Sequence, residues 1–434
     1  MKYSASRLAG VAVAGALLVP ASAHAAKKSF TVCQHGCKYS TIQKAVDASG
    51  PGATINVKPG KYVEGVIVKG AKHNGIKIIG RGRKPTDVIL EGKDAKGPGG
   101  LAQNGVELVG VDNSSVQNVW ARNYASNGIF VHGVDTDHPC TGYLFKNDRV
   151  SFNRSYGIYA FRCIGGRMTQ DVGYGHGDSA YYIGGTPFQD KPVWSYIDHS
   201  VGYENVLGYS GTNSKYVDIR NNEFYNNGAG VVPNTLKSEP DQPGTTGIIE
   251  ENLIYWNNFN YYKANSPVKT VSSGVGIGSF NYPTGVGVIL FGVDHWIVKN
   301  NSIFGNFKWG TATFSDPTND TGKALSGHNE FRTNLMGAPF GDLNGVDFWH
   351  DGSGNGTCYS DNSAGATFDP GAEPNLILYP ACPTELGTGG LVGDPTQDAD
   401  LLGYASQAEG QEDSWVKHPH PKRLDRKPID GMEG

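Results

Sequence analysis

The feature that most constrains the fold is a short signature that recurs along the chain, roughly two dozen residues apart. Each copy opens with a glycine or small residue, continues with alternating apolar positions, and ends in polar residues that include a further asparagine. Copies of its first strand occupy residues 104–109, 127–132, 156–161, 179–184, 229–234 and 286–291. Strands this short cannot bury an apolar face alone, so their turns must stack around one continuous core.

Two polar columns keep step with the strands. The first column holds Asn118, Asn147, Gln170, His199, Asn222, Asn252 and Asn301, and the second holds Asn123, Asn153, Gly175, Asn205, Asn227, Asn258 and Asn306. Asparagine tolerates a left-handed backbone, and its amide can bond to the same position in the next turn. The pattern predicts an all-β chain, a right-handed parallel β-helix over residues 53–316. The period is interrupted in four places, where we expect loops that leave the solenoid: residues 133–142, 185–193, 235–247 and 259–284.

The two ends of the repeat region have different patterns. Residues 40–43 form a capping-box pattern that opens a short amphipathic helix, with Ile42, Ala45 and Val46 on one face. We expect residues 26–52 to cap the first open end of the core. We expect residues 317–406 to form a closing module that is cross-linked by a disulfide. The polar composition of segment 407–434 predicts a disordered tail.

The segments 40–46 and 55–62 together resemble the opening of pectin-lyase-like β-helix proteins, and the G-I-x-V and N-N-x-I repeats resemble the repeat of that superfamily. Residues 345–358 are similar to a C-terminal module of actinobacterial β-helix proteins. Members of the superfamily are often polysaccharide lyases, glycoside hydrolases or uronate epimerases, while others are adhesins or tailspikes. The resemblance therefore implies the fold and leaves the reaction to the residues.

The first 25 residues have the pattern of a Sec-type signal peptide. Lys2 and Arg7 precede the apolar segment 8–19, and residues 23–25 form an A-x-A cleavage site. This run is too short to span a bilayer, and no later stretch approaches about 18 uncharged apolar residues. We therefore expect a secreted protein, a monomer without a membrane span in its mature chain.

Charge and cysteine content narrow the partners and the compartment. The formal net charge is −4, and loss of Lys2 and Arg7 leaves 35 basic against 41 acidic residues, which argues against nucleic acid as a partner. The six cysteines allow 15 pairings, and an oxidising compartment favours disulfides. Proximity along the chain suggests the pairs Cys33–Cys37, Cys140–Cys163 and Cys358–Cys382.

The calcium-dependent lyase reaction finds weak support in the residues. Residues 193–200 are similar to the V-W-I-D-H signature of pectate lyases, but with an interruption at Ser195 and Tyr196. The repeat alignment places His199 in a corner column, which favours a corner role for Asp198 and His199 over catalysis. Glu107 is the one carboxylate expected on the outward positions of the first strands, so no Ca²⁺ site is identified and no other cofactor or metal is expected.

A second motif lies at residues 174–179, where His176 and Asp178 stand in the place of the G-H-G motif of family-28-type hydrolases. Inverting hydrolysis also needs a pair of carboxylates, and the preceding turns lack the aspartates that the resemblance requires. A turn role and a catalytic role therefore both stay open for His176 and Asp178. Arg162 is a third catalytic candidate.

The outward face of the first strands suggests a binding surface. Alternation places Phe130, Tyr159 and Tyr182 in one outward column, and His132 and Phe161 in the next, with Arg162 beside them. Such a strip can bind sugar rings, while Arg162 and His132 offer polar contacts. The alternative is that the loops at 133–142 and 185–193 fold over these rings.

Together these patterns favour a secreted protein that binds a polysaccharide or cell-envelope glycan along its first sheet, and that cleaves or epimerises it. The rival function is that of a noncatalytic envelope or surface-interaction protein, in which the solenoid is a rigid scaffold.

Overall fold

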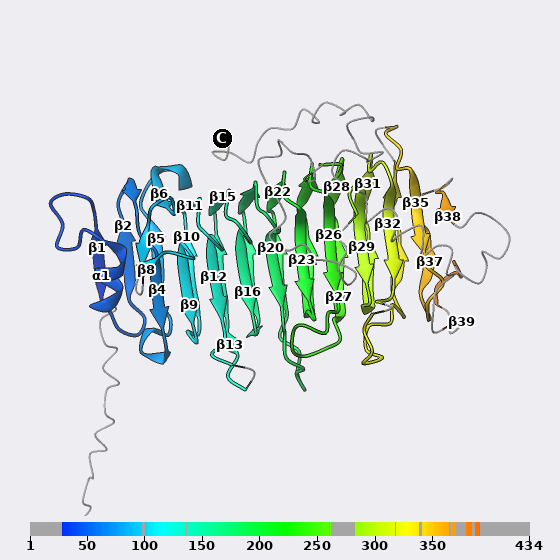
Figure 1. Cartoon of the computed structure of the whole chain (residues 1–434), viewed down its shortest axis with the longest axis horizontal. Helices are drawn as coiled ribbons and strands as arrows, with labels where there is room; N and C mark the ends of the chain where they lie inside the picture. The colour runs from blue at the N-terminus through cyan, green and yellow to red at the C-terminus, as the bar shows by residue number, and fades with distance from the viewer. Residues whose placement is uncertain are drawn as a thin grey trace, which may run out of the picture.

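The computed structural model describes residues 28–390, apart from residues 98–99, 136, 260, 262–282, 317, 338–340, 364–365, 370–378 and 384–386. The predicted signal peptide (1–25), the tail (407–434) and the last part of the predicted closing module lie outside the described residues. Three long parallel sheets run side by side along one axis, and the turns stack into an elongated coil (Figure 1).

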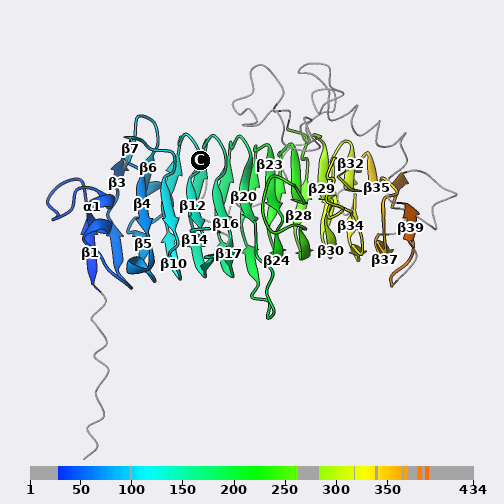
Figure 2. The ribbon, with the colours of Figure 1, turned by 60° about the horizontal axis from the view of Figure 1, so that its bottom comes forward.

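We call the sheet whose strands open each turn the first sheet. Its strands are β4 (Val66–Lys69), β9 (Val106–Val109), β12 (Ile129–His132), β16 (Ile158–Phe161), β20 (Ser179–Gly184), β23 (Leu207–Thr212), β26 (Ala229–Asn234), β29 (Val286–Phe291), β32 (Trp309–Phe314), β35 (Val346–His350) and β38 (Phe368–Asp369). β12, β16 and β20 lie side by side in Figure 2. In the strand order of this sheet, two strands precede them on the N-terminal side and six follow on the other.

The second sheet comprises β1 (Ser29–Val32), β2 (Thr54–Val57), β5 (Lys77–Gly80), β10 (Ser114–Gln117), β14 (Tyr143–Lys146), β18 (Gly166–Thr169), β21 (Ser195–Asp198), β24 (Lys215–Arg220), β27 (Thr245–Glu250), β30 (Asp294–Lys299), β33 (Glu330–Arg332) and β37 (Cys358–Ser360). The third comprises β3 (Gly60–Tyr62), β6 (Val88–Glu91), β11 (Trp120–Arg122), β15 (Arg149–Ser151), β19 (Val172–Tyr174), β22 (Val201–Tyr203), β25 (Glu223–Tyr225), β28 (Leu253–Tyr255), β31 (Ser302–Phe304) and β34 (Leu335–Met336).

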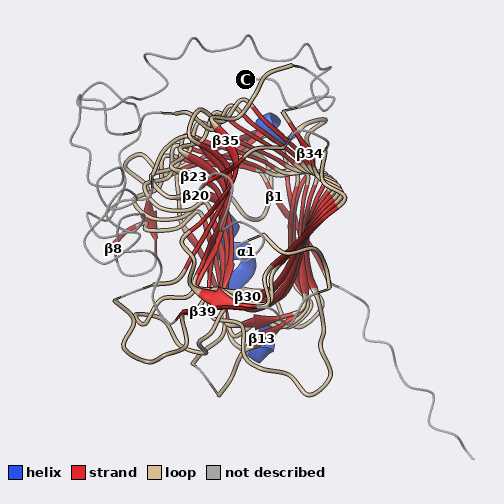
Figure 3. Cartoon of the chain, turned by 90° about the vertical axis from the view of Figure 1, so that its right-hand side faces the viewer, coloured by secondary structure: helices blue, strands red, loops and turns tan. Residues whose placement is uncertain are grey.

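The remaining elements lie outside the three sheets. They are β7 (Lys96–Gly97) with β8 (Gly100–Leu101), β13 (Cys140–Thr141) with β17 (Cys163–Ile164), β36 (Gly354–Asn355) with β39 (Gly387–Gly390), the helix α1 (Ile42–Asp47), and the 3₁₀ turns η1 (Ala71–His73) and η2 (Pro85–Asp87). Seen along the coil axis, successive strands superpose into walls around the core, and α1 crosses one end (Figure 3).

The predicted right-handed parallel β-helix is confirmed, but its ladders extend beyond the predicted range of 53–316. β1, which lies in the segment expected to be only a cap, pairs in parallel with β2. β35 and β37 continue the ladders through the segment expected to be a separate module. The period is weaker in the sequence after Asp316, but the strands there still add to the same sheets.

The capping helix forms, but its N-terminus is stabilised differently from the prediction. Thr41 is the N-cap, and its Oγ1 accepts from the Lys44 amide at 3.3 Å. Glu64 accepts from the amides of Ile42 and Gln43, at 2.8 and 3.1 Å. The Glu64 carboxylate therefore binds two of the free amides at the helix N-terminus, a role that was expected of the capping box.

Two of the three corners carry a ladder of side chains that accept the amide of the preceding turn. Between the second and third sheets the acceptors are Asp148, Asp171, Ser200, Asn222, Asn252, Asn301, Asn334 and Asn362. Between the third and first sheets they are Asn153, His176, Asn205, Asn227, Asn257, Asn306 and Asn344. The residue before each acceptor has a left-handed backbone in most turns, as at His199 (φ 52°) and Gly175 (φ 72°).

Candidate active site on the first sheet

The outward side chains of β12, β16 and β20 form the predicted strip. Backbone pairing aligns Phe130 with Tyr159 and Tyr159 with Tyr182, and it aligns His132 with Phe161. Tyr182 is buried with 1% of its surface exposed, whereas the other four are partly exposed. The alternation argument therefore placed all five residues on the correct face of the sheet.

The rings of the strip pack on one another. Phe130 stacks on Tyr159 and on His132, with centroids 4.4 Å apart in both pairs, and Tyr159 meets Tyr182 edge-to-face at 4.6 Å. Rings stacked along the coil axis direct their edges outward, because their faces contact neighbouring rings. The geometry therefore gives little support to the predicted stacking of sugars on ring faces, and it favours contacts with ring edges and hydroxyls.

Two carboxyl groups meet the tyrosine hydroxyls of this strip. The Tyr182 hydroxyl donates to Oε2 of Glu239 at 2.7 Å, and Tyr156 is hydrogen-bonded to the carboxyl of Asp178. The Tyr156 ring lies 4.6 Å from the Tyr159 ring and 4.8 Å from the Tyr182 ring. We call Tyr156, Tyr159, Tyr182, Asp178 and Glu239 the tyrosine–carboxylate cluster.

Burial makes both carboxyl groups of the cluster weak acids. Desolvation, with a smaller contribution from the charge of Glu239, raises the pKa of Asp178 to about 7. Desolvation likewise raises the pKa of Glu239 to about 7, against the lowering effects of the Tyr182 hydrogen bond and of Arg162. Near neutral pH each group is therefore able both to donate and to accept a proton, as general acid–base catalysis requires.

The phenols beside these carboxyl groups stay protonated. Burial, together with the charges of Glu239 and Asp178, raises the pKa of Tyr159 well above its usual value, and Tyr182 is raised in the same way. Both phenols are therefore neutral, and the Tyr182 hydroxyl is the one that donates to the Glu239 carboxylate.

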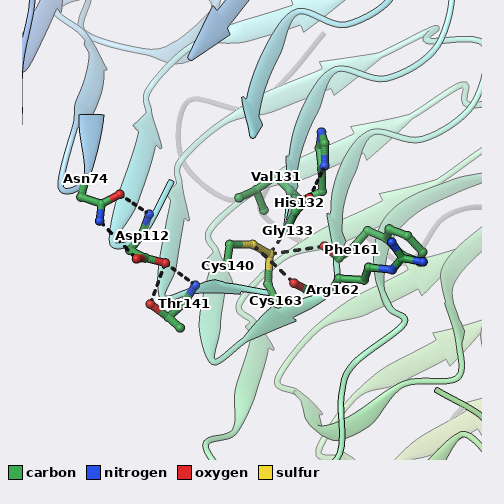
Figure 4. The surroundings of a disulfide bond; sticks show 10 residues. All are labelled: Asn74, Asp112, Val131, His132, Gly133, Cys140, Thr141, Phe161, Arg162 and Cys163. Carbon is green, nitrogen blue, oxygen red and sulfur yellow. Dashed lines mark hydrogen bonds between the residues drawn. A yellow bond between two sulfur atoms is a disulfide. The ribbon is translucent and has the colours of Figure 1, made fainter. Parts of the chain in front are cut away.

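Arg162 borders the cluster and is held by the Cys140–Cys163 disulfide. Its guanidinium lies 5.0 Å from the Phe161 ring centre, and its charge lowers the pKa of Tyr159 and of Glu239. The Cys140 amide donates to the Arg162 carbonyl at 3.0 Å, and Figure 4 shows the disulfide between Cys140 and Cys163 next to Arg162. All three disulfide pairs suggested by proximity are present.

At the N-terminal side of the strip, His132 pairs with Glu107. The Nε2 atom of His132 lies 3.3 Å from Oε1 of Glu107, and the Nδ1 atom lies 2.7 Å from the Gly133 carbonyl. Glu107 also accepts from Asn104 Nδ2 at 2.8 Å, and the hydrogen bond from His132 is the largest cause that lowers the pKa of Glu107. This end of the strip is therefore a charged hydrogen-bonding subsite.

His176 does not belong to the site, contrary to its prediction as a catalytic residue. It is fully buried, and its Nδ1 atom accepts from the Asn153 amide at 3.3 Å while its own amide donates to Asn205 Oδ1. Desolvation lowers its pKa to about 3, so the ring is neutral. His176 therefore takes the place of an asparagine in the ladder, whereas Asp178, two residues further, reaches the cluster.

The Asp198–His199 pair lies at a corner, as expected, although the ladder residue of this turn is Ser200, one position after His199. Asp198 is buried and accepts from Arg167 Nε and Nη2, at 2.7 and 3.0 Å, on the outward face of the second sheet. His199 is exposed and left-handed, and its Nδ1 atom contacts Asp198 at 2.9 Å. This arrangement lies on a different sheet from the cluster.

Sequence reasoning missed Glu239 and Tyr156. Glu239 lies in the loop after β26, within a segment that was recognised only as a departure from the period. Tyr156 precedes Gly157 in a strand copy, and the glycine was used for alignment while its neighbour was passed over. A carboxylate in a loop that follows a first-sheet strand was the available signal for Glu239.

Metal and membrane features were also searched for. Within the described ranges, no three His, Cys, Asp or Glu side chains gather in a group that suits a metal ion. No helix in that part of the chain has the length and apolar character needed to span a membrane.

Comparisons with known proteins give a likeness of fold. No family model and no curated sequence matches the chain. The A-module of the mannuronan C-5 epimerase AlgE4 from Azotobacter vinelandii aligns with a TM-score of 0.53 at 15% identity, over 74% of this chain and 82% of that one. The AlgE6 A-module of the same organism aligns over 76% and 95% of the two chains at 13% identity and a TM-score of 0.49. Pectate lyase Pel9A aligns over 82% and 81% at 14% identity and a TM-score of 0.41.

Identity this low carries the fold alone. With its three parallel sheets, the chain is a right-handed parallel β-helix protein, with the fold of the AlgE4 A-module.

Proposed function

We propose that this protein is secreted, binds a polysaccharide along the outward face of its first sheet, and cleaves or epimerises it at the tyrosine–carboxylate cluster. The observation that carries this proposal is that two carboxyl groups with a pKa near 7, Asp178 and Glu239, are hydrogen-bonded to Tyr156 and Tyr182, whose rings lie 4.8 Å apart beside the aromatic strip. The three disulfides support export, because they are typical of an oxidising compartment.

Two carboxyl groups that exchange protons near neutral pH suit both reactions. In hydrolysis, one carboxyl gives its proton to the glycosidic oxygen as the C–O bond breaks, and the other carboxylate accepts a proton from the attacking water. In epimerisation, one group removes the proton beside a uronate carboxylate and the other returns a proton to the opposite side. Arg162 is placed to bind a hydroxyl or a sugar carboxylate in either case.

The experiment compares wild type with Glu239→Gln on a panel of alginate, pectate, xylan and α-glucan. Reducing ends, absorbance of unsaturated products and NMR of sugar configuration distinguish hydrolysis, elimination and epimerisation. We expect Glu239→Gln to lower kcat by about 100-fold or more, because it removes a proton-transfer group.

Asp190→Asn is the matched control, because Asp190 is an exposed carboxylate in the loop after β20. Its kcat should stay within about twofold of wild type. An active wild type whose kcat is unchanged by Glu239→Gln contradicts the assignment of the cluster.

A second candidate function is that of a noncatalytic envelope or surface-interaction protein. It is favoured by the small exposure of Asp178, 4%, and of Tyr182, 1%, since deeply covered groups contact a polymer poorly. Glycan binding by calorimetry without turnover of any of the four polymers supports this function over the catalytic one.

A further inference from the structure

A buried lysine ties together two loops beside the tyrosine–carboxylate cluster. Lys215 opens β24 and is fully buried, and its Nζ donates to the carbonyl oxygens of Thr186 (3.0 Å), Asn213 (3.2 Å) and Asp241. The ammonium also lies 4.3 Å from the centre of the Phe188 ring. A buried ammonium is costly unless such acceptors surround it, so this contact set is a built feature of the fold.

Asn213, two residues earlier, holds the loop that carries Glu239. Its Nδ2 atom donates to the carbonyls of Leu236 (3.0 Å), Glu239 (2.9 Å) and Pro240 (3.0 Å). Its Oδ1 atom accepts from the Leu236 amide at 3.2 Å. One fully buried amide therefore fixes the backbone on both sides of the Glu239 side chain.

The two loops joined in this way flank the cluster. Residues 185–194 follow β20, which carries Tyr182, and residues 235–244 follow β26 and carry Glu239. The base of the second loop is closed by the Gly244 amide, which donates to Thr235 Oγ1 at 2.9 Å. Within this frame, the Tyr182 hydroxyl meets the Glu239 carboxylate.

We propose that Lys215 and Asn213 are positioning residues, which together clasp the 185–194 and 235–244 loops and thereby hold the Glu239 carboxylate on the Tyr182 hydroxyl. The Lys215 ammonium is the cation that the three backbone carbonyl oxygens surround, and it takes the place that a bound metal ion could have in such a cage. The catalytic part of this inference rests on the proposed function, whereas the ordering of the loops does not.

Lys215→Met and Asn213→Ala test the clasp, with Lys237→Met as the matched control. Lys237 lies in the 235–244 loop that carries Glu239, but its side chain is exposed and pairs with the exposed Asp320 at 2.6 Å. We expect Lys215→Met and Asn213→Ala each to raise amide hydrogen exchange across residues 236–244 by about tenfold or more, with exchange in β12, β16 and β20 unchanged. Lys237→Met should leave the loop exchange at the wild-type rate.

Chemical rescue separates a cation role from packing alone. Millimolar methylammonium added to the Lys215→Ala protein should enter the vacated carbonyl cage and return loop exchange toward the wild-type rate, whereas methanol at equal concentration should not. With a polymer that the wild-type protein turns over, Lys215→Met should lower kcat about tenfold with little change in KM. Methylammonium should restore kcat in the Lys215→Ala protein.

The outcomes for the clasp and for the function are distinguishable. Wild-type loop exchange in both clasp variants overturns the clasp, whether or not the protein turns over a glycan. Equal rescue by methanol and methylammonium overturns the cation role. Faster loop exchange in a protein that processes none of the four polymers supports the clasp while contradicting the catalytic function.

Discussion

At the scale of single residues, the ladders decide which polar side chains are structural. His176 and Asp178 are two residues apart in one motif, yet the first is a ladder acceptor and the second belongs to the tyrosine–carboxylate cluster. The motif alone does not tell which of the two residues is structural, because that depends on which side of the corner each side chain faces.

The ladder role of His176 leads to a direct prediction. His176→Asn should retain the fold and the glycan turnover, because Asn Oδ1 replaces Nδ1 as acceptor for the Asn153 amide, as in the neighbouring turns. His176→Ala should lose about 1–3 kcal/mol of unfolding free energy, because it leaves that buried amide unpaired. Urea denaturation and kcat measurements check both variants. A His176→Asn protein with wild-type stability and no turnover would return His176 to the catalytic residues.

Asp148 and Asp171 predict an unusual dependence of stability on pH. Desolvation raises the pKa of both buried carboxyl groups well above its usual value, so the folded chain binds protons that the unfolded chain releases. Stability from these groups is therefore fully present below the unfolded pKa of about 4 and falls as pH rises toward the folded values.

Asp148→Asn or Asp171→Asn should flatten this fall and raise the melting temperature at pH 8 relative to wild type, as differential scanning calorimetry at pH 5 and pH 8 measures. Asp361→Asn, at an exposed corner, is the control and should leave the pH slope unchanged. Equal slopes in wild type and both ladder variants would show that the two carboxyl groups are ionised in the fold.

At the scale of elements, sequence periodicity predicts the strands and their outward faces well, while it predicts the corner register less well. The predicted columns hold true ladder acceptors at Asn222, Asn252 and Asn301 and at Asn153, Asn205, Asn227 and Asn306. The other assigned residues are one position off, since Asn118, Asn147, Gln170, His199, Asn123 and Gly175 each precede the ladder residue and Asn258 follows it. Two neighbouring corner positions both favour asparagine, one for its left-handed backbone and one for its amide. Pairs such as Asn226–Asn227, in which the first residue is left-handed (φ 51°) and the second is the acceptor, therefore leave the register ambiguous by one residue.

The loops explain why only part of the candidate site was predictable. Phe130, Tyr159 and Tyr182 follow from alternation, whereas Glu239 reaches the cluster through a loop whose course depends on Asn213 and Lys215. No periodic rule gives the course of such a loop, because its contacts are long-range and specific to this chain. The sequence analysis also missed a stack of aromatic rings on the third sheet, because it looked only for polar residues near the corners. The rings, with centroids 5.0–5.3 Å apart, belong to Tyr174, Tyr203, Tyr225, Tyr255 and Phe304.

At the scale of the whole molecule, the N-terminal cap covers one end of the solenoid core. Ile42, Ala45 and Val46 of α1 are buried at the end of the core, where the first coil would otherwise present open strands to another chain. Val46→Asp should therefore promote concentration-dependent, end-to-end assembly, detected by sedimentation velocity. Asp47→Asn, on the exposed side of the helix, is the control and should sediment as wild type. A Val46→Asp protein that sediments as wild type at all concentrations would show that the cap is dispensable.

The interior place of β12, β16 and β20 in the first sheet has a consequence for how the protein withstands damage. In a solenoid each coil contacts only its neighbours, so partial unfolding frays inward from the two ends. Two strands separate the aromatic strip from one end and six separate it from the other. A molecule that has lost its last coils to heat or to a protease therefore keeps the surface on which a glycan would be processed.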